Sequence, residues 1–435
     1  MKYYCIGIKG AGMSTLANIL HDLGNEVIGY DDSTYFKYTE EGLNKRGIKI
    51  YNPKDLPELD SDVIVTYSRA FSDNHPEIVR VKNLGLTIKA YNNVVGDITK
   101  MFDTIAISGT HGKTTTSLLL SNILSNTLGC NYFVGDGSGY ASKNNKLFVI
   151  EADEFNKHFL AYYPKIAVIT NIELDHTECY DGLDDIINTF KTFSSKSNLI
   201  IACGDDENIR KIDFDKPVIY YGFNSNNDVI AKNVELNENG SKFDVYINNE
   251  YYDTYFIPLY GNHMILNSLS AIIVANHYNV SKDDIKKYIN EFKGAKRRFK
   301  IENINGYTII DDYAHHPTEI SVTIDSARQK YPDKEIVAIF LPNTYSRTEA
   351  LKDDFISCLS KADKTYIMDI HCDREDPKDY PNVNSDMLIE NIPNSEKVSE
   401  DTVEKLLKHR ENSVLCFMSC ANIYVILDKF KSIIK

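Results

Sequence analysis

Three features are scarce or missing in this sequence, and each absence argues against a class of protein. No apolar run approaches the roughly 18 residues that a membrane-spanning helix needs, so a membrane protein is not expected. None of the eight cysteines belongs to a CxxC pair, so we expect buried free thiols in a reducing compartment rather than a metal site or disulfides. Acidic residues (62) outnumber basic ones (48), and the net charge of −14 would repel nucleic acid.

The beginning of the sequence also lacks the marks of a targeting segment. It reads MKYYCIGIKGAGMS and enters an apolar strand pattern directly, without a basic region, a long apolar stretch or a small-residue cleavage site. We therefore expect a cytoplasmic protein.

The composition is that of a globular protein, with 43% hydrophobic and 25% charged residues. A chain of 435 residues is too long for one ordinary core and predicts two to three domains. Three stretches alternate strands with helices, the pattern of parallel α/β sheets. We predict a Rossmann-like domain over 1–100, a central P-loop-type domain with a mixed sheet over 101–298, and a Rossmann-like domain over 299–435.

The Tyr-rich stretch at 228–259 departs from this pattern. Its side chains alternate with a period of two, and NNE at 248–250 is typical of a tight turn. Antiparallel strands are expected there.

The strongest local signal for function is SGTHGKTTT at 108–116, between a buried strand and a helix. Backbone N–H groups of such a turn and the helix N-terminus form a cradle for phosphate. Lys113 adds a positive charge and Thr114 a hydroxyl for Mg²⁺. The common GxxxxGK[ST] pattern would have its first glycine at Ile107, so this loop is a variant.

Glu151 in FVIEADE and His176 in TNIELDH are each predicted to end an apolar strand of the same sheet. Both side chains would then lie at the carboxyl edge, where ligands of such sheets bind. A carboxylate and an imidazole beside a triphosphate can hold Mg²⁺. An acidic residue that merely forms a turn is the structural alternative for each.

Two further motifs follow, KRRF at 296–299 and DDYAHHPTE at 311–319. Arg297 and Arg298 could clamp phosphate oxygens, and Asp312 at a strand end could accept ribose hydroxyls. A helix cap with Pro317 at the first helical position would explain His316 without any catalytic role.

The first glycine-rich turn, GIKGAGMS at 7–14, lies between a strand and a helix, and Asp31 ends the next strand. Its glycines do not have the G-x-G-x-x-G spacing of a dinucleotide fingerprint when read from Gly7. A diphosphate could still bind at the helix start. The motif alone does not separate a sugar nucleotide from a nicotinamide dinucleotide.

In their order along the chain, GTHGKTTT, EADE, TNIELDH, GNHMILN, KRRF and DDYAHHPTE resemble the motif series of the Mur ligase family, and DDYAHHPTE with GIKGAGMS is similar to its alanine-adding branch. The resemblance implies domains for UDP-N-acetylmuramate, for ATP with Mg²⁺ and for the incoming amino acid. It also implies amide-bond formation through an acyl phosphate in peptidoglycan precursor synthesis, by a monomer or homodimer.

The resemblance assigns roles to residues at matching positions. Lys113, His176, Arg298 and His315 would be catalytic. The metal ligands would be Thr114, Glu151 and His176. The remaining roles are grouped by ligand. ATP would be bound by the loop residues Gly109, Thr110, His111, Gly112, Lys113, Thr114 and Thr115, with Asn267 at adenine, Arg298 at the transferred phosphate and Asp312 at the ribose. The UDP-sugar would be bound by Gly10, Ala11, Gly12, Met13, Ser14 and Asp31, and the amino acid by Tyr313, His315 and Arg347.

The sequence departs from the family pattern in three places. Phe190 stands where some members carry a carbamylated lysine, which suits the alanine-adding branch. Asn343 replaces a usual histidine four residues before Arg347. Residues 419–422 read SCAN where a glycine-rich turn is common, so two glycines are lost. A ligase for another amino acid or precursor, and a non-catalytic nucleotide-binding homologue, remain alternatives.

Overall fold

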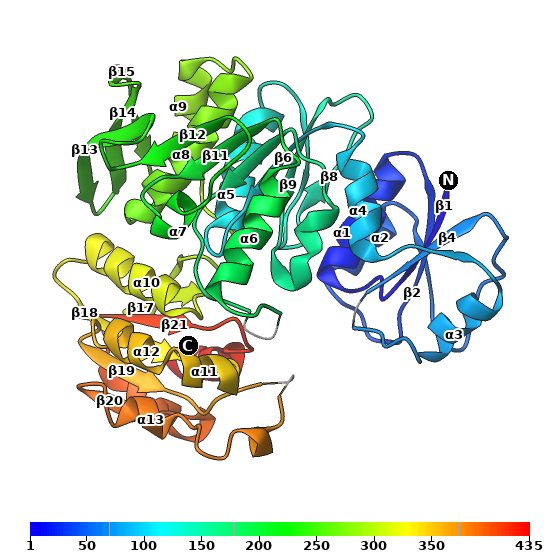
Figure 1. Cartoon of the computed structure of the whole chain (residues 1–435). Helices are drawn as coiled ribbons and strands as arrows, with labels where there is room; N and C mark the ends of the chain where they lie inside the picture. The colour runs from blue at the N-terminus through cyan, green and yellow to red at the C-terminus, as the bar shows by residue number, and fades with distance from the viewer. Residues whose placement is uncertain (69, 177–178, 373–374) are drawn as a thin grey trace. The chain divides into compact units, whose positions relative to one another are not determined.

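A computed structural model describes residues 1–68, 70–176, 179–372 and 375–435. Within these ranges, no helix is long and apolar enough to cross a membrane. The chain forms two compact units. The first contains residues 1–232, 245–253 and 266–289, and the second contains 233–244, 254–265 and 290–435. Three sheets with covering helices give the predicted α/β class (Figure 1).

The first sheet has the strand order β3-β2-β1-β4-β5 with all pairs parallel, which matches the first five strands of the six-stranded Rossmann order 3-2-1-4-5-6. Its elements alternate along the chain: β1 (Lys2–Ile6), α1 (Ala11–Asp22), β2 (Glu26–Tyr30), α2 (Glu40–Lys45), β3 (Lys49–Tyr51), β4 (Val63–Tyr67), α3 (Pro76–Asn83), β5 (Thr87–Ile88) and α4 (Tyr91–Thr99). The core of this sheet is aliphatic and aromatic, with Tyr4, Ile6 and Val65 fully buried.

The central sheet has ten strands in the order β15-β14-β13-β12-β11-β10-β6-β9-β7-β8. β6 lies between β9 and β10 and pairs with both in parallel, and Ile105, Ala106 and Ile107 within it are fully buried. The strands are β6 (Asp103–Ser108), β7 (Cys130–Phe133), β8 (Gly139–Tyr140), β9 (Leu147–Glu151), β10 (Ile166–Ile169), β11 (Leu199–Cys203), β12 (Val218–Gly222), β13 (Val229–Asn237), β14 (Gly240–Ile247) and β15 (Glu250–Ile257).

Helical segments accompany these strands in sequence. They are α5 (Lys113–Ser125), η1 (Phe155–Ala161), α6 (Leu183–Ser194), α7 (Glu207–Arg210), α8 (Asn262–His277) and α9 (Lys282–Asn290). The Tyr-rich stretch forms β13, β14 and β15. Asn248 and Asn249 join β14 to β15 with φ values of 51° and 69°, as expected for the predicted tight turn.

The third sheet has the order β16-β17-β21-β18-β19-β20, and only β16 is antiparallel to its neighbour. One apolar cluster packs α10, α12 and α13, which Figure 1 labels, on one face of the sheet. Another cluster packs α14 and η3 on the other face. The elements are β16 (Lys300–Ile304), β17 (Tyr307–Asp312), α10 (Pro317–Lys330), β18 (Glu335–Phe340), α11 (Tyr345–Ala350), α12 (Lys352–Leu359), β19 (Lys364–Ile367), η2 (Pro377–Asp379), α13 (Asp386–Ile389), β20 (Ser395–Lys397), η3 (Glu400–Lys408), β21 (Ser413–Met418) and α14 (Tyr424–Ile434).

A buried histidine at the end of η3 predicts a pH-dependent stability. His409 Nδ1 lies 3.0 Å from Glu335 Oε2, and Nε2 lies 3.1 Å from Tyr366 Oη. Burial lowers the pKa of His409, and Glu335 opposes this only in part. The unfolded chain therefore takes up this proton more readily, and stability is lost as pH falls through the unfolded pKa of about 6.5.

We expect this histidine to contribute to a fall in melting temperature between pH 7.5 and 5. The melting temperature of His409→Gln should be below that of wild type at pH 7.5, because the variant loses the hydrogen bonds of the neutral imidazole to Glu335 and Tyr366, but the difference from wild type should narrow as pH falls. Calorimetry of both proteins across this range measures the difference, and a constant difference would contradict the assignment.

Candidate active site

The phosphate loop joins the end of β6 to the start of α5, and it requires glycine at two positions. Gly109 and Gly112 have φ values of 131° and 83°. A Cβ atom at Gly109 would lie 2.0 Å from Thr170 Oγ1, and one at Gly112 would lie 2.9 Å from Asn267 Oδ1. The loop is thus tightly enclosed, and the predicted adenine residue Asn267 lies beside it.

Residues that follow β10 hold this loop in place, although no role was predicted for them from the sequence. Asn171 O accepts from Thr110 N at 3.0 Å, and Asn171 Oδ1 accepts from His111 N at 2.8 Å. Thr170 Oγ1 donates to His111 O at 2.6 Å. The signal was present, because TNIE follows a buried strand that is adjacent to β6.

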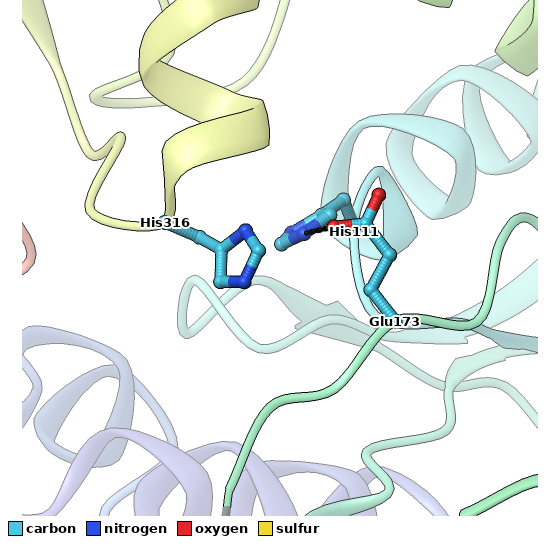
Figure 2. A group of neighbouring side chains, drawn as sticks. All are labelled: His111, Glu173 and His316. Carbon is cyan, nitrogen blue, oxygen red and sulfur yellow. Dashed lines mark ion pairs between the residues drawn. The ribbon is translucent and has the colours of Figure 1, made fainter. Parts of the chain in front are cut away.

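Figure 2 shows the imidazole of His111 beside the carboxylate of Glu173, with 3.5 Å between Nε2 and Oε2. His316, also drawn there, belongs to the second unit. It is the N-cap of α10, with Pro317 at the first helical position and a capping box to Glu319. The capping alternative for His316 and Pro317 is therefore confirmed.

Lys113 lies at the first position of α5 and is largely buried. Its ammonium donates to Gly109 O at 2.7 Å and Thr110 O at 3.0 Å, and it lies 2.8 Å from Glu154 Oε2. Burial by itself would lower the pKa of Lys113, but the charges of Glu154 and Asp153 outweigh it and raise the pKa above its ordinary value. The lysine is therefore positively charged at neutral pH.

Thr114 and Glu151 meet next to this lysine. Thr114 Oγ1 donates to Glu151 Oε1 at 2.9 Å, and Gly135 N donates to Glu151 Oε2 at 2.7 Å. Burial raises the pKa of Glu151, while the Gly135 hydrogen bond and Lys113 oppose the rise. A hydroxyl and a carboxylate this close are oxygen ligands of the kind Mg²⁺ prefers, so these two residues fit a cation.

His176 is not where the sequence analysis predicted it. β10 ends at Ile169, and His176 lies seven residues later in an irregular segment with a φ of 53°. The prediction that it ends a strand was wrong, because the polar residues from Thr170 onward bond to the phosphate loop and leave the sheet. His176 still gathers with Asp153 and Glu154, and one potential ligand atom from each lies within 4.8 Å of the others.

In the second unit, Asp312 ends β17 as predicted, but both of its oxygens have backbone partners. Oδ1 accepts from Ala314 N and Oδ2 from Phe299 N, each at 2.8 Å. Burial raises the pKa of Asp312 to about 6, with Arg298 opposing the rise.

Glu319, which the sequence analysis left without a role, links two predicted catalytic residues. Its Oε1 lies 3.1 Å from Arg298 Nη1, and its Oε2 lies 3.0 Å from His315 Nδ1. The Arg298 guanidinium also lies 5.1 Å from the centre of the Tyr313 ring. Arg298, Tyr313, His315 and Glu319 therefore form one polar cluster at the start of α10.

The other positions of this unit that the sequence singled out lie in α11 and in the loops that follow β18 and β21. Arg347 is in the short helix α11, and Asn343 Nδ2 donates to His371 O at 3.2 Å. None of residues 419–422 has a positive φ. Ser419 Oγ instead accepts from Ala421 N at 2.9 Å and donates to Leu341 O at 2.8 Å, so this turn does not depend on glycine.

The first glycine-rich turn leads into α1, whose N-cap Gly10 lacks a side-chain cap and whose first turn has no acidic residue. Such a helix start favours anions. Asp31 is directed inward, because its oxygens accept from Lys9 N and Ser33 N, each at 3.0 Å. Met13 and Ser14 are buried in α1, while Ala11 and Gly12 line its first turn.

Phe190, at the position of the carbamylated lysine, is fully buried and packs edge-on against Phe159 at 5.2 Å. The Phe190 side chain is apolar, so this position cannot supply a metal ligand.

Comparison with known proteins places Mur ligase domains along the chain. Residues 2–103 match the Mur ligase family catalytic domain, 107–275 the Mur ligase middle domain and 297–419 the glutamate ligase domain of Mur ligases. The structure of UDP-N-acetylmuramate-alanine ligase from Thermotoga maritima is similar, with 25% identity over 99% of this chain and 98% of that one and a TM-score of 0.80.

Two other solved structures resemble the chain in fold. A murein peptide ligase from Psychrobacter arcticus has 23% identity over 99% of this chain and 98% of that one, with a TM-score of 0.70. A pseudomurein peptide ligase type C from Methanothermus fervidus has 19% identity over 99% of both chains and also a TM-score of 0.70.

Proposed function

The chain belongs to the Mur ligase family of ATP-dependent ligases that add an amino acid or peptide to a cell-wall precursor, and within this family we propose that it joins L-alanine to the carboxylate of UDP-N-acetylmuramate. The observation that carries the ligase assignment is the arrangement of Lys113, Thr114 and Glu151 at one end of β6 and β9. The alanine assignment is supported by the likeness to the Thermotoga maritima enzyme along the whole chain.

In the proposed reaction, the substrate carboxylate attacks the γ-phosphorus of ATP, and ADP leaves with the bridging oxygen. The amine of the amino acid then attacks the acyl carbon of the acyl phosphate, and inorganic phosphate departs. The protein forms no covalent bond in this reaction. It catalyses the reaction by positioning the substrates and by neutralising the negative charge of the phosphoryl group.

Each group of residues has a proposed role in this reaction. Lys113 holds the phosphates and neutralises their charge, while Thr114, Glu151 and His176 hold Mg²⁺, which would supply further neutralisation at the phosphoryl group. Asn267 faces adenine. In the second unit, Arg298 binds the transferred phosphate and Asp312 the ribose. The proton released from the amine goes to His315 or to solvent.

The remaining assignments follow the proposed domains, with boundaries at 100 and 298. Residues 10–14 at the start of α1 bind the diphosphate of the UDP-sugar, and the family resemblance assigns Asp31 to the same substrate. Tyr313, His315 and Arg347 bind the amino acid, with the Arg347 guanidinium suited to a carboxylate. We propose a cytoplasmic monomer or homodimer that acts in peptidoglycan precursor synthesis.

A second candidate is a ligase of the same kind that takes another amine or another precursor. Asn343 and residues 419–422 depart from the family pattern in the domain proposed to bind the amine, and murein and pseudomurein peptide ligases have similar folds. This candidate has the same ATP site and differs only in the amine or the cell-wall precursor that it joins.

ADP release measured with a panel of UDP-sugar acids, amino acids and short peptides, UDP-N-acetylmuramate and L-alanine among them, separates the candidates. We expect L-alanine to exceed glycine and L-serine in kcat/KM by more than about tenfold, which is roughly 1.4 kcal/mol of transition-state discrimination. A different amine winning by that margin would retain the ligase class and overturn the alanine assignment. ATP binding without ADP release for every acceptor would indicate a non-catalytic homologue.

A further inference from the structure

The helix α4 lies in sequence between the first sheet and the central sheet, and close contacts fix it to the segments around the central sheet. A Cβ atom at Gly96 would lie 2.2 Å from Ala161 O, so the backbone of α4 packs directly against the end of η1. Thr99 Oγ1 accepts a hydrogen bond from Tyr163 N at 3.0 Å. Tyr91, the first residue of α4, is therefore held on a well-anchored helix.

The hydroxyl of Tyr91 lies beside the first turn of α1. A Cβ atom at Gly12 would lie 2.9 Å from Tyr91 Oη and 3.5 Å from Cζ. The first distance is too short for a methyl group, which would push the hydroxyl away, whereas the second is an ordinary van der Waals contact. Gly12 has no positive φ, so glycine is needed at this position for space and not for its backbone conformation.

The start of α1 offers hydrogen-bond donors to a ligand. As in any α-helix, the first N–H groups, which here belong to Ala11, Gly12 and Met13, have no carbonyl partner one turn earlier in the helix. Together with the helix dipole, such groups favour an anion. The Tyr91 hydroxyl adds a side-chain donor from a different helix next to these backbone donors.

The Tyr91 hydroxyl is itself in need of an acceptor. Within the part of the chain that the structure describes, its Oη has no hydrogen-bond partner, although the side chain is partly buried. Burial raises the pKa of Tyr91, and the charge of Asp153 raises it further, so the hydroxyl keeps its proton at neutral pH. Because tyrosine hydroxyls inside proteins usually find a partner, a protonated and unpaired one beside an anion site indicates an acceptor on the ligand.

We propose that Tyr91 binds the diphosphate of the UDP-sugar, with its hydroxyl donating a hydrogen bond to a phosphate oxygen beside Gly12. The anion is then held by backbone N–H groups of α1 and by a side chain of α4. Since α4 packs against η1, the same bond ties the diphosphate to the sheet that carries the phosphate loop. The inference rests on the proposed function, in which residues 10–14 bind the diphosphate, and adds a residue from outside the glycine-rich turn.

Tyr91→Phe removes the hydroxyl and keeps the ring that packs beside Gly12. UDP is the probe, titrated by calorimetry in the presence of saturating ADP and Mg²⁺, which occupy the phosphate loop. We expect about tenfold weaker UDP binding, the usual scale for losing a hydrogen bond to a charged group. Tyr163→Phe is the matched control, because the ring of this exposed tyrosine contacts Lys100 and Lys196, and it should bind UDP as wild type does.

Steady-state kinetics separate a contact with the UDP-sugar from a general structural effect. The KM of Tyr91→Phe for the UDP-sugar should rise about tenfold, while its kcat and its KM for ATP change by less than about twofold. Circular dichroism spectra and melting temperatures establish that the variant is folded.

Gly12→Ala tests the same contact from α1. In the wild-type background its methyl group displaces the hydroxyl, so UDP binding should weaken. In the Tyr91→Phe background the methyl group meets Cζ at 3.5 Å, and the further loss should be no more than about twofold. Equal losses in the two backgrounds would contradict a contact between the hydroxyl and the ligand beside Gly12.

UDP binding by folded Tyr91→Phe that is as tight as that of wild type would overturn the inference. Failure of the proposed function gives a different result, the absence of ADP release with every acceptor while the UDP affinities of the variants follow the expected order. The two outcomes are therefore distinguishable.

Discussion

Lys113→Met is expected to lower the rate of ADP release by about 10³-fold or more. Lys113 is the charged residue of the phosphate loop, at the first position of α5, and its ammonium lies within hydrogen-bond distance of two loop carbonyls. Removing one preorganised donor to a developing charge commonly costs 10²- to 10³-fold, and a full charge beside a transferred phosphoryl group contributes more. A coupled assay of ADP release with saturating ATP measures the loss.

The structure also predicts a stability effect of this substitution, and a control for it. Removing one partner of a buried ion pair typically costs about 3–5 kcal/mol, because the other charge stays buried. Lys113→Met should therefore lower the melting temperature. The double variant Lys113→Met with Glu154→Gln removes both charges and should recover much of the stability, yet remain inactive. Near-normal turnover in either variant would remove the ATPase assignment.

The sequence predicted the parts of the active site that depend on strands and on local turns. Glu151 and Thr114 meet because Glu151 ends β9 and Thr114 lies in the first turn of α5, after the neighbouring strand β6. An apolar run indicates the position of Glu151, and an apolar run followed by a glycine turn indicates that of Thr114. The turn at Asn248 and Asn249 is another local feature, because asparagine tolerates positive φ.

Contacts made by irregular segments were not predictable in the same way. The Glu154 to Lys113 pair forms where the chain leaves β9 and passes through Asn156 and Lys157, which have φ values of 52° and 59°. Unlike the asparagine pair at 248 and 249, this segment has a lysine at its second left-handed position, and nothing in its sequence indicates that conformation. His176 was misplaced for a related reason, because hydrogen bonds to the phosphate loop end β10 early while the sequence around it still alternates like a strand.

Short edge strands were also missed. β3 and β20 have three residues each, too few for a periodic pattern, and β16 alternates weakly because its residues are only partly buried or exposed.

The direction of the Asp31 side chain could not be predicted from the sequence either. Its position at a strand end is readable from sequence, but the direction of its carboxylate toward Lys9 N and Ser33 N depends on how the following loop folds back.

Glu319→Ala is expected to lower kcat about 100-fold with a much smaller change in the KM for ATP. The carboxylate holds Arg298 Nη1 at 3.1 Å through one oxygen and His315 Nδ1 at 3.0 Å through the other. It thus fixes the distance between a proposed phosphate ligand and a proposed proton acceptor. Displacements of about 1 Å in such groups can cost around 10²-fold in rate.

A fold-stabilising role alone would give a different result. Glu319 also belongs to the capping box of α10, so its loss should cost about 1 kcal/mol of stability as well. Glu319→Gln keeps the side-chain volume and an acceptor for the backbone of His316, and should therefore recover the stability while kcat stays low, because the amide carries no charge for Arg298. Glu302→Gln is the matched control, a carboxylate of the same unit that pairs with Lys300 and Lys431. If Glu319→Gln restored kcat together with the melting temperature, the residue would serve the helix cap and not the positioning of Arg298 and His315.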